Sequence, residues 1–178
     1  MNSKKLFIAL GLYWLIIISS IFAFNQYILL TGTQVLLRTV PIDPRSLFRG
    51  DYVALSYEIS RINLDSISFE YNDFTALELN EPVCVSLKIE NGYAYPERIS
   101  SKPPQNSLFI KGTISTRTND FIEVAYGIET FFVPEGQGKE IEQKMGKALD
   151  VKASIDRYGN AVIHSLMSEN KPVVFTSP

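Results

Sequence analysis

An almost unbroken run of apolar residues occupies the amino-terminal part of the chain. It extends from Leu6 to Phe24, contains no charged residue and directly follows Lys4 and Lys5. At a rise of about 1.5 Å per residue, a helix of this length nearly crosses the hydrocarbon core of a bilayer, which is about 30 Å thick. A cleaved signal peptide is the competing interpretation, but its apolar region spans only about 7–15 residues. The longer run therefore favours a retained membrane anchor.

The charges next to this run predict how the anchor is oriented. Lys4 and Lys5 lie at its amino-terminal end, and positively charged flanks stay preferentially on the cytoplasmic side of a membrane. We therefore expect residues 1–30 to form an N-terminal membrane anchor with a cytoplasmic amino terminus, and residues 31–178 to form an exported β-rich domain. No second apolar run of spanning length follows. The sequence thus predicts a single-pass protein of the inner (or thylakoid) membrane with a periplasmic or lumenal domain.

Alternation of apolar and polar residues predicts that the exported domain consists mainly of β-strands. The segments with this pattern are 35–40, 52–59, 82–90, 93–100, 108–117, 121–125, 130–133, 151–155 and 161–167. Asn91-Gly92 is a typical hairpin turn between two of them, and the segment 156–160 predicts a second hairpin. The expected fold class is therefore mainly β (α+β), with one transmembrane helix followed by an antiparallel β-rich domain.

The remaining segments of the domain predict less regular structure. Residues 60–81 mix polar and apolar side chains without a clear period, which indicates an irregular excursion. Residues 139–149 carry Ile141, Met145 and Leu149 at helical spacing and predict the one short helix of the domain. Residues 171–178 are expected to form a trailing strand or tail.

Charged residues are unusually dense between Arg38 and Ile59. The arginines and carboxylates of this stretch are Arg38, Asp43, Arg45, Arg49, Asp51 and Glu58. Pro41 and Pro44 make its entry rigid, because proline fixes φ and pushes the preceding residue toward an extended conformation. Bidentate donors and carboxylates at this density predict an ion-pair and hydrogen-bond cluster that attaches a loop to a sheet.

Two blocks of the chain resemble a known family. Gly50-Asp51-Tyr52, followed by Leu55 and Tyr57, resembles the signature of the bacterial GDYXXXLXY family of membrane-anchored proteins, with two residues where that name has three between tyrosine and leucine. The block from Tyr126 to Gly136 is similar to the second recurrent segment of the family. The resemblance spans nearly the whole chain, and it implies no particular activity, since the family has none established. It implies a companion of multi-pass membrane proteins.

The two blocks together define a candidate structural and functional cluster. It comprises Arg38, Asp43, Arg45, Arg49, Gly50, Asp51, Tyr52, Tyr57, Tyr126, Glu129, Pro134, Glu135 and Gly136. We expect Glu129 or Glu135 to pair with Arg49 and so to join the blocks. Tyr126, Phe131 and Phe132 form a candidate aromatic patch, which is an interface if it is exposed and core if it is buried.

Residues that commonly carry catalysis or bind metals are sparse. Cys84 and His164 are the single cysteine and the single histidine, and each lies in a predicted strand. The sequence contains no zinc-ligand spacing, phosphate-binding loop or dinucleotide fingerprint. We therefore expect no catalytic residue, no metal and no cofactor. A net charge of −2 and a pI near 5.5 argue against a nucleic-acid partner.

Two further functions remain as alternatives. Asp51, Glu129 and Glu135 could form a carboxylate site of a hydrolase or a Ca²⁺-binding domain. A signal-peptidase-like scaffold is the second alternative, although Ser46 has no recognisable lysine base. The favoured hypothesis is a non-enzymatic exported domain that is anchored through Leu6 to Phe24 and acts as an interaction or assembly partner of a larger, multi-pass membrane protein.

Overall fold

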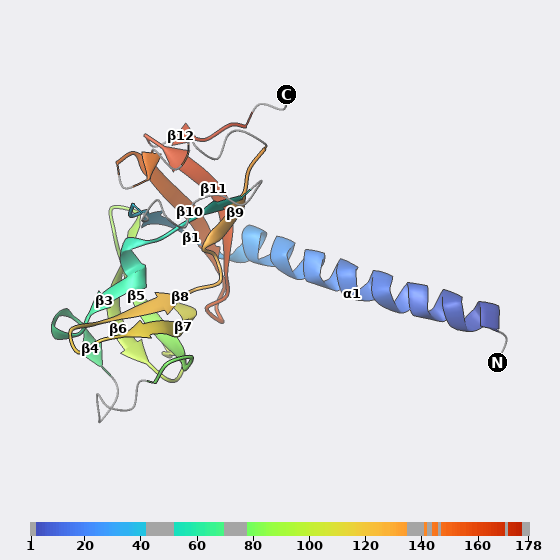
Figure 1. Ribbon diagram of the computed structural model, residues 1–178, viewed down its shortest axis with the longest axis horizontal. Helices are drawn as coiled ribbons and strands as arrows, with labels where there is room; N and C mark the ends of the chain where they lie inside the picture. Colours follow the sequence, from blue (N-terminus) through green and yellow to red (C-terminus); the bar gives the residue numbers. More distant parts are fainter. Residues whose placement is uncertain are drawn as a thin grey trace.

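The protein consists of a β-rich body at the end of one long helix (Figure 1). The computed structural model describes residues 3–41, 52–69, 78–134, 141, 144–145, 147–169 and 171–175. Helix α1 comprises Ser3–Thr31. It is long and apolar enough to cross a membrane by length and composition. The helix therefore contains the whole predicted apolar run and continues beyond it.

The strands of the body confirm the predicted fold class, a mainly antiparallel β structure. They are β1 (Thr33–Arg38), β2 (Tyr52–Ala54), β3 (Arg61–Asn63), β4 (Ser68–Phe69), β5 (Pro82–Glu90), β6 (Tyr93–Ser100), β7 (Phe109–Arg117), β8 (Phe121–Ala125), β9 (Thr130–Phe132), β10 (Leu149–Ile155), β11 (Ala161–Ser168) and β12 (Lys171–Pro172). Short 3-10 helices cover Glu58–Ser60 and Leu64–Ser66. The bounds of β5 and β6 are those predicted from the sequence, and Asn91 and Gly92 between them both have positive φ, as this hairpin turn requires.

Most strands belong to one large sheet, in the order β12-β11-β10-β1-β6-β5-β7-β8-β3, with β4 added beside β6. The pairs β1–β6 and β4–β6 are parallel, and the other pairs of this sheet are antiparallel. Strands β2 and β9 form a separate antiparallel pair. Leu37, Val85, Ile110 and Val151, from four strands, have no exposed surface and form part of one continuous hydrophobic core.

The segment 52–59 differs from its prediction as one continuous strand. Its alternation of burial is as expected, because Val53, Leu55, Tyr57 and Ile59 are all buried. The strand nevertheless ends at Ala54. The amide of Leu55 still donates to Glu129, which directly precedes β9, but the carbonyl of Ser56 accepts from Val40, so the backbone changes partner at Ser56.

Three other segments also allow a comparison with the sequence. Residues 60–81 are more regular than expected, because β3 pairs with β8 and β4 pairs with β6 within this range. The predicted helix 139–149 is described at residues 141, 144–145 and 147–149, of which Ile141 and Lys144 are helical. Its predicted end is wrong, because Met145 forms a β-bridge with Leu149, which already belongs to β10. Strand β12 occupies the start of the predicted trailing segment.

The carboxy-terminal end of α1 packs against the β-rich body. Ile28 is only 1% exposed, and the helix contacts β10 and β11. Gly32 follows the helix directly, and a Cβ atom there would lie 2.6 Å from the carbonyl oxygen of Ile28 and 3.0 Å from the backbone nitrogen of Ile155. A side chain has no room at this position, because the nearest atoms belong to the backbone. The helix is therefore joined to the domain by a close packed contact.

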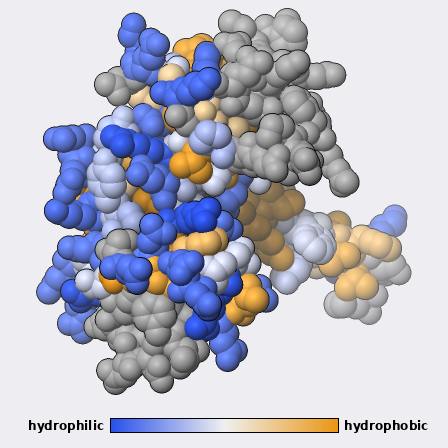
Figure 2. All heavy atoms as spheres, turned by 60° about the vertical axis from the view of Figure 1, so that its left-hand side comes forward, coloured by the Kyte–Doolittle hydropathy of each residue, from blue (hydrophilic) through white to orange (hydrophobic). Residues whose placement is uncertain are grey.

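The hydrophobic surface is distributed unevenly between the two parts of the molecule. Most large side chains of α1 from Leu6 to Phe24 are more than half exposed. The face of the domain that Figure 2 shows is mainly hydrophilic, whereas the helix behind it is mainly hydrophobic. A long exposed apolar helix is typical of a segment that is covered by lipid or by other membrane helices.

Candidate functional site

Two buried tyrosines connect the two sequence blocks. The hydroxyl of Tyr57, in the first block, donates a hydrogen bond to the carbonyl oxygen of Ile128 in the second. The hydroxyl of Tyr126, in the second block, donates to the carbonyl oxygen of Ile59 in the first, at 2.6 Å. Each tyrosine therefore binds the carbonyl two residues after the other tyrosine. We call this pair of contacts the tyrosine interlock.

Glu129 fixes the chain beside the interlock. Its carboxylate accepts a hydrogen bond from the backbone amide of Tyr126, at 2.5 Å, and its carbonyl accepts from the amide of Leu55, at 2.8 Å. The turn in between contains Gly127, whose φ of +80° is a conformation that glycine adopts without strain. The side chain and the backbone of Glu129 therefore both stabilise the junction of the two blocks.

The blocks are also connected to the large sheet. Tyr57 forms a β-bridge with Thr39, and the amide of Val40 donates to the carbonyl of Ser56. Thr39 is buried, and its hydroxyl donates to the carbonyl of Leu149 at the start of β10. Because β10 also contacts α1, a short chain of packed elements links the interlock to the helix.

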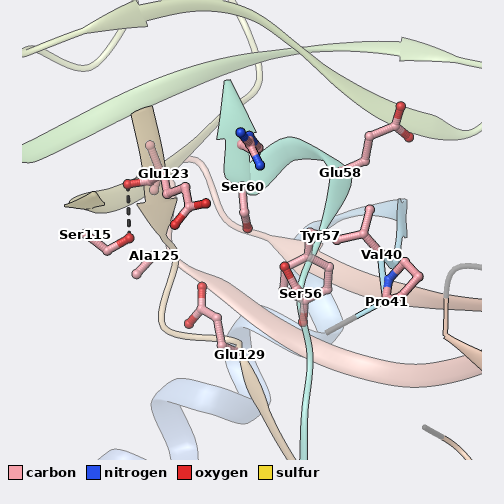
Figure 3. A pocket seen from close by; sticks show the side chains of 12 residues that line it. Val40, Pro41, Ser56, Tyr57, Glu58, Ser60, Ser115, Glu123, Ala125 and Glu129 are labelled. Atoms are coloured by element: carbon pink, nitrogen blue, oxygen red, sulfur yellow. Dashed lines mark hydrogen bonds between the residues drawn. The ribbon is translucent and has the colours of Figure 1, made fainter. Parts of the chain in front are cut away.

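A cavity of about 600 Å³ lies beside the interlock. Its lining consists of Val40, Pro41, Ser56, Tyr57, Glu58, Ser60, Arg61, Ser115, Glu123, Val124, Ala125 and Glu129. Figure 3 shows Glu123 and Glu129 on one side, facing Ser56 and Ser60 on the other. The hydroxyl of Ser60 is buried and has no hydrogen-bond partner among the described atoms. The lining carries three carboxylates and one guanidinium, and this balance favours a positively charged group.

Both tyrosines of the interlock resist ionisation. Burial raises the pKa of Tyr57 far above its usual value near 10, and the negative charge of Glu129 raises it further. The pKa of Tyr126 is raised by the same two causes in the same order. Both hydroxyls consequently remain protonated, and able to donate, throughout the physiological pH range.

The cluster predicted from the sequence is only partly described by the structure. Of its members, Arg38, Tyr52, Tyr57, Tyr126, Glu129 and Pro134 lie among the described residues. The others, Asp43, Arg45, Arg49, Gly50, Asp51, Glu135 and Gly136, lie outside them, as does Ser46. The expected pairing of Arg49 with Glu129 or Glu135, and the alternative carboxylate site of Asp51, Glu129 and Glu135, therefore remain predictions.

The described members of the predicted cluster lie in different parts of the structure. Tyr57, Tyr126 and Glu129 come together, whereas Arg38 lies at the end of β1, an inner strand of the large sheet between β10 and β6. Its guanidinium lies 4.7 Å from the ring centroid of Tyr93 and 4.0 Å from the carboxylate of Glu58, the one expected partner that is described. Both side chains of this ion pair are about half exposed, so it contributes little to stability.

The remaining cluster members and the predicted aromatic patch divide between core and surface. Tyr126 is buried and Phe131 is half-buried, while Phe132 is 77% exposed. Tyr52 packs edge-on against Phe132, with ring centroids 6.3 Å apart. Pro134 is half-buried and follows the buried Val133. Among these described residues, Phe132 and Tyr52 are the exposed aromatic ones.

The residues with other chemical potential lie elsewhere. Cys84 is free and buried, and burial raises the pKa of its thiol while Lys111 partly opposes this. His164 is exposed on β11. Lys88 pairs with Glu90 on the surface, at 2.7 Å. Within the described part of the chain, no group of three or more His, Cys, Asp or Glu side chains is arranged to hold a metal ion.

The sequence pattern did not reveal the acceptors of the interlock. The carbonyls of Ile59 and Ile128 belong to backbone that any residue type could supply, and the two tyrosines are separated by 68 intervening residues. The contact of Ile28 with the body was also missed, because an apolar residue near the end of an apolar run carries no distinguishing signal. Gly32 was the one residue that could have indicated this contact, since glycine allows another backbone segment to approach closely.

These observations define a β-rich domain that is fixed to the end of a helix long enough to span a membrane. The chain belongs to the GDYXXLXY protein family, whose model matches residues 14–166. Because the family pattern has two residues between tyrosine and leucine, Val53 and Ala54 fit it, and the expectation of three was wrong. Neither the search of curated proteins nor the search of solved structures found a match.

Proposed function

We propose that this protein is a non-enzymatic, membrane-anchored module that acts as an interaction or assembly partner of a larger, multi-pass membrane protein. The observation that carries the proposal is the packed junction between α1 and the domain, formed by Ile28, Gly32 and Ile155. An anchor that only tethers a domain needs no such junction and is compatible with a flexible linker. A packed junction instead gives the domain a defined position relative to the membrane.

The exposed helix supports a partner within the bilayer. Large apolar side chains surround α1 from Leu6 to Phe24, and small polar residues such as Ser19 and Ser20 interrupt them. The hydroxyl of Ser20 bonds to the carbonyl of Ile16 in the same helix. Small residues favour close packing of transmembrane helices. Lys4 and Lys5 support a cytoplasmic amino terminus, and with it a domain on the periplasmic or lumenal side.

The interlock supports a structural role for the family motif. Tyr57 and Tyr126 use their hydroxyls to connect backbone segments, and the raised pKa of each keeps these hydroxyls protonated. Neither tyrosine is poised to transfer a proton at neutral pH. The motif thus serves to hold β2 and β9 on the body, and the surface that results is the part offered to a partner.

Copurification of the full-length tagged chain from its native membranes tests this proposal. The decisive variant carries the four-residue sequence Gly-Ser-Gly-Ser inserted after Gly32. This insertion uncouples the domain from the helix and leaves the sequences of both unchanged. We expect one large membrane protein to copurify in constant ratio with the natural chain and to be lost with the insertion.

The Arg49→Ala variant is compared in parallel. Gly11→Ala is the control, because a Cβ atom at position 11 meets nothing within 4 Å. Equal recovery with and without the insertion would contradict a role for the rigid junction, and no partner in any sample would contradict the proposal itself.

A further inference from the structure

The length of α1 indicates where the outer boundary of the membrane lies. A bilayer hydrocarbon core needs about 20 helical residues, and α1 contains 29. Counted from Leu6, the first residue after the lysines, 20 residues end at Asn25. The helix beyond this point includes Ile28, which is buried against the domain. With Leu6 at the cytoplasmic boundary of the hydrocarbon core, this count puts the boundary on the side of the domain near Asn25.

A second cavity, of about 510 Å³, opens at this level. One wall is Asn25 of α1, and the opposite walls come from β9, β11 and the segment before β9. Its apolar lining includes Ile128, Phe131, Phe132, Val162 and Ile163, and its polar residues are Asn25 and Thr130. The volume lies within the range of small-ligand pockets, roughly 300–1,000 Å³. Figure 1 shows β9 and the β10–β11 hairpin beside the end of the helix.

An exposed aromatic side chain, Phe132, lines this cavity, and Tyr52 packs against it. Phe132 is 77% exposed and Tyr52 is 37% exposed, and their rings are in edge-to-face contact. A phenylalanine this exposed is costly in water, whereas aromatic rings are enriched at membrane interfaces. The cost disappears if the cavity mouth faces lipid.

We propose that this cavity binds one phospholipid from the leaflet beneath the domain. Its apolar walls take a segment of an acyl chain, and the amide of Asn25 with the hydroxyl of Thr130 supplies hydrogen bonds for the ester or phosphate oxygens. Lipid is the favoured occupant because one wall of the cavity is Asn25 of the apolar helix itself. The count from Leu6 puts this residue near the depth where acyl chains and headgroups meet. The inference rests on the proposed membrane anchoring and adds a ligand of defined chemistry to it.

Native mass spectrometry of the full-length chain, released from nanodiscs of phosphatidylcholine and phosphatidylglycerol, tests the proposal. The variant Val162→Trp fills the cavity, and Val174→Trp is the matched control, because Val174 is 80% exposed and does not line this cavity. We expect the natural chain and the control to retain one phospholipid, and the fraction of Val162→Trp with a lipid to be at least tenfold lower. Equal retention by the two variants would overturn the proposal, as would a protein in place of the lipid.

A second measurement does not depend on the folding of the Val162 variant. With Trp14 replaced by phenylalanine, Phe132→Trp provides a fluorescent probe at the cavity mouth, and Leu79→Trp provides an exposed control on the body. We expect lipids brominated near the glycerol end to quench the probe several-fold more than the control. Equal quenching would overturn the lipid site. Trp14 of the natural chain lies in the middle of the apolar run, so lipids brominated near the ends of their acyl chains should quench it. Absence of that quenching would instead contradict membrane anchoring, so the two failures are distinguishable.

Discussion

Tyr57 and Tyr126 bind each other's sequence block reciprocally, each through the carbonyl oxygen two residues beyond the other tyrosine. The symmetry of these contacts explains why two blocks far apart in the chain form one unit. Both tyrosines are buried, so each hydroxyl needs an acceptor and each carbonyl needs a donor. Satisfying all four groups at once requires both blocks to be in place.

Replacing either tyrosine with phenylalanine should therefore destabilise the domain. Tyr57→Phe leaves the carbonyl of Ile128 without this donor, and we expect a loss of about 1–3 kcal/mol in the free energy of unfolding. Tyr126→Phe should cost a similar amount. Denaturant unfolding of the full-length protein in detergent, followed by near-UV circular dichroism, measures both. Tyr158→Phe is the control, because Tyr158 is 52% exposed, and a loss as large as that of Tyr57→Phe would contradict this explanation.

The interlock also predicts how stability depends on pH. The pKa values of Tyr57 and Tyr126 are raised in the folded protein by burial and then by Glu129, whereas unfolded tyrosine titrates near 10. Above pH 10 the unfolded state loses protons that the folded state keeps, so stability falls as pH rises. The stabilising contribution is complete below pH 10.

We expect each tyrosine to contribute a decrease of about 1.4 kcal/mol per pH unit above pH 10. Unfolding measured between pH 8 and pH 11.5 tests this, with the double variant Tyr57→Phe/Tyr126→Phe as the control. Its stability should depend less steeply on pH by the sum of the two contributions. An unchanged pH dependence in the double variant would show that other groups cause the loss.

Gly32 provides a test of the junction between helix and domain. A Cβ atom there would approach backbone atoms of Ile28 and Ile155 that cannot move independently. We expect Gly32→Ala to destabilise the junction by about 1–3 kcal/mol, as overpacking typically does. Hydrogen exchange of the backbone amides from residues 28 to 36 measures it directly, with faster exchange expected in the variant.

The control for this prediction is Gly11→Ala, because Gly11 lies in the same helix with open space around it. Alanine is also the better helix former. Gly11→Ala should leave exchange at residues 28 to 36 unchanged. Similar exchange rates in both variants and in the natural chain would mean that a side chain at position 32 does not destabilise the junction.

The predicted pairing of Arg49 with Glu129 can be tested by mutation of both residues. In a double-mutant cycle of Arg49→Ala and Glu129→Gln, a direct pair gives a coupling energy of about 0.5–3 kcal/mol. The conservative Glu129→Gln keeps an oxygen that can accept from the amide of Tyr126. Unfolding of the four proteins gives the coupling energy, and additive effects within about 0.5 kcal/mol would exclude a direct pair.

Local signals predicted most of the fold. The alternation in 82–90 and 93–100, with Asn91-Gly92 between them, sufficed for β5 and β6 because each of these features acts over a few residues. The pattern failed at 52–59, since the chain there changes partner from β9 to the segment around Val40. It also missed β3 and β4, which are too short to establish a period.

The candidate site was less predictable, because its contacts are long-range. The family blocks named Tyr57, Tyr126 and Glu129, but their backbone acceptors and donors have no signature in the sequence. The cavity beside Asn25 depends on how β9 and β11 pack against α1, which no local pattern specifies. Phe132 was named as part of an aromatic patch, and only the fold separates its exposed ring from the buried Tyr126.

The central claim, that the protein works as a membrane-anchored partner of a larger membrane protein, is tested most directly by photo-crosslinking in native membranes. A photoreactive residue replaces Trp14, which is 57% exposed in the middle of the apolar run of α1. We expect a crosslink to one specific multi-pass membrane protein, and its loss when the sequence Gly-Ser-Gly-Ser is inserted after Gly32. Crosslinks to lipid alone, from a protein that is abundant in the membrane, would contradict a role as a partner of a larger membrane protein.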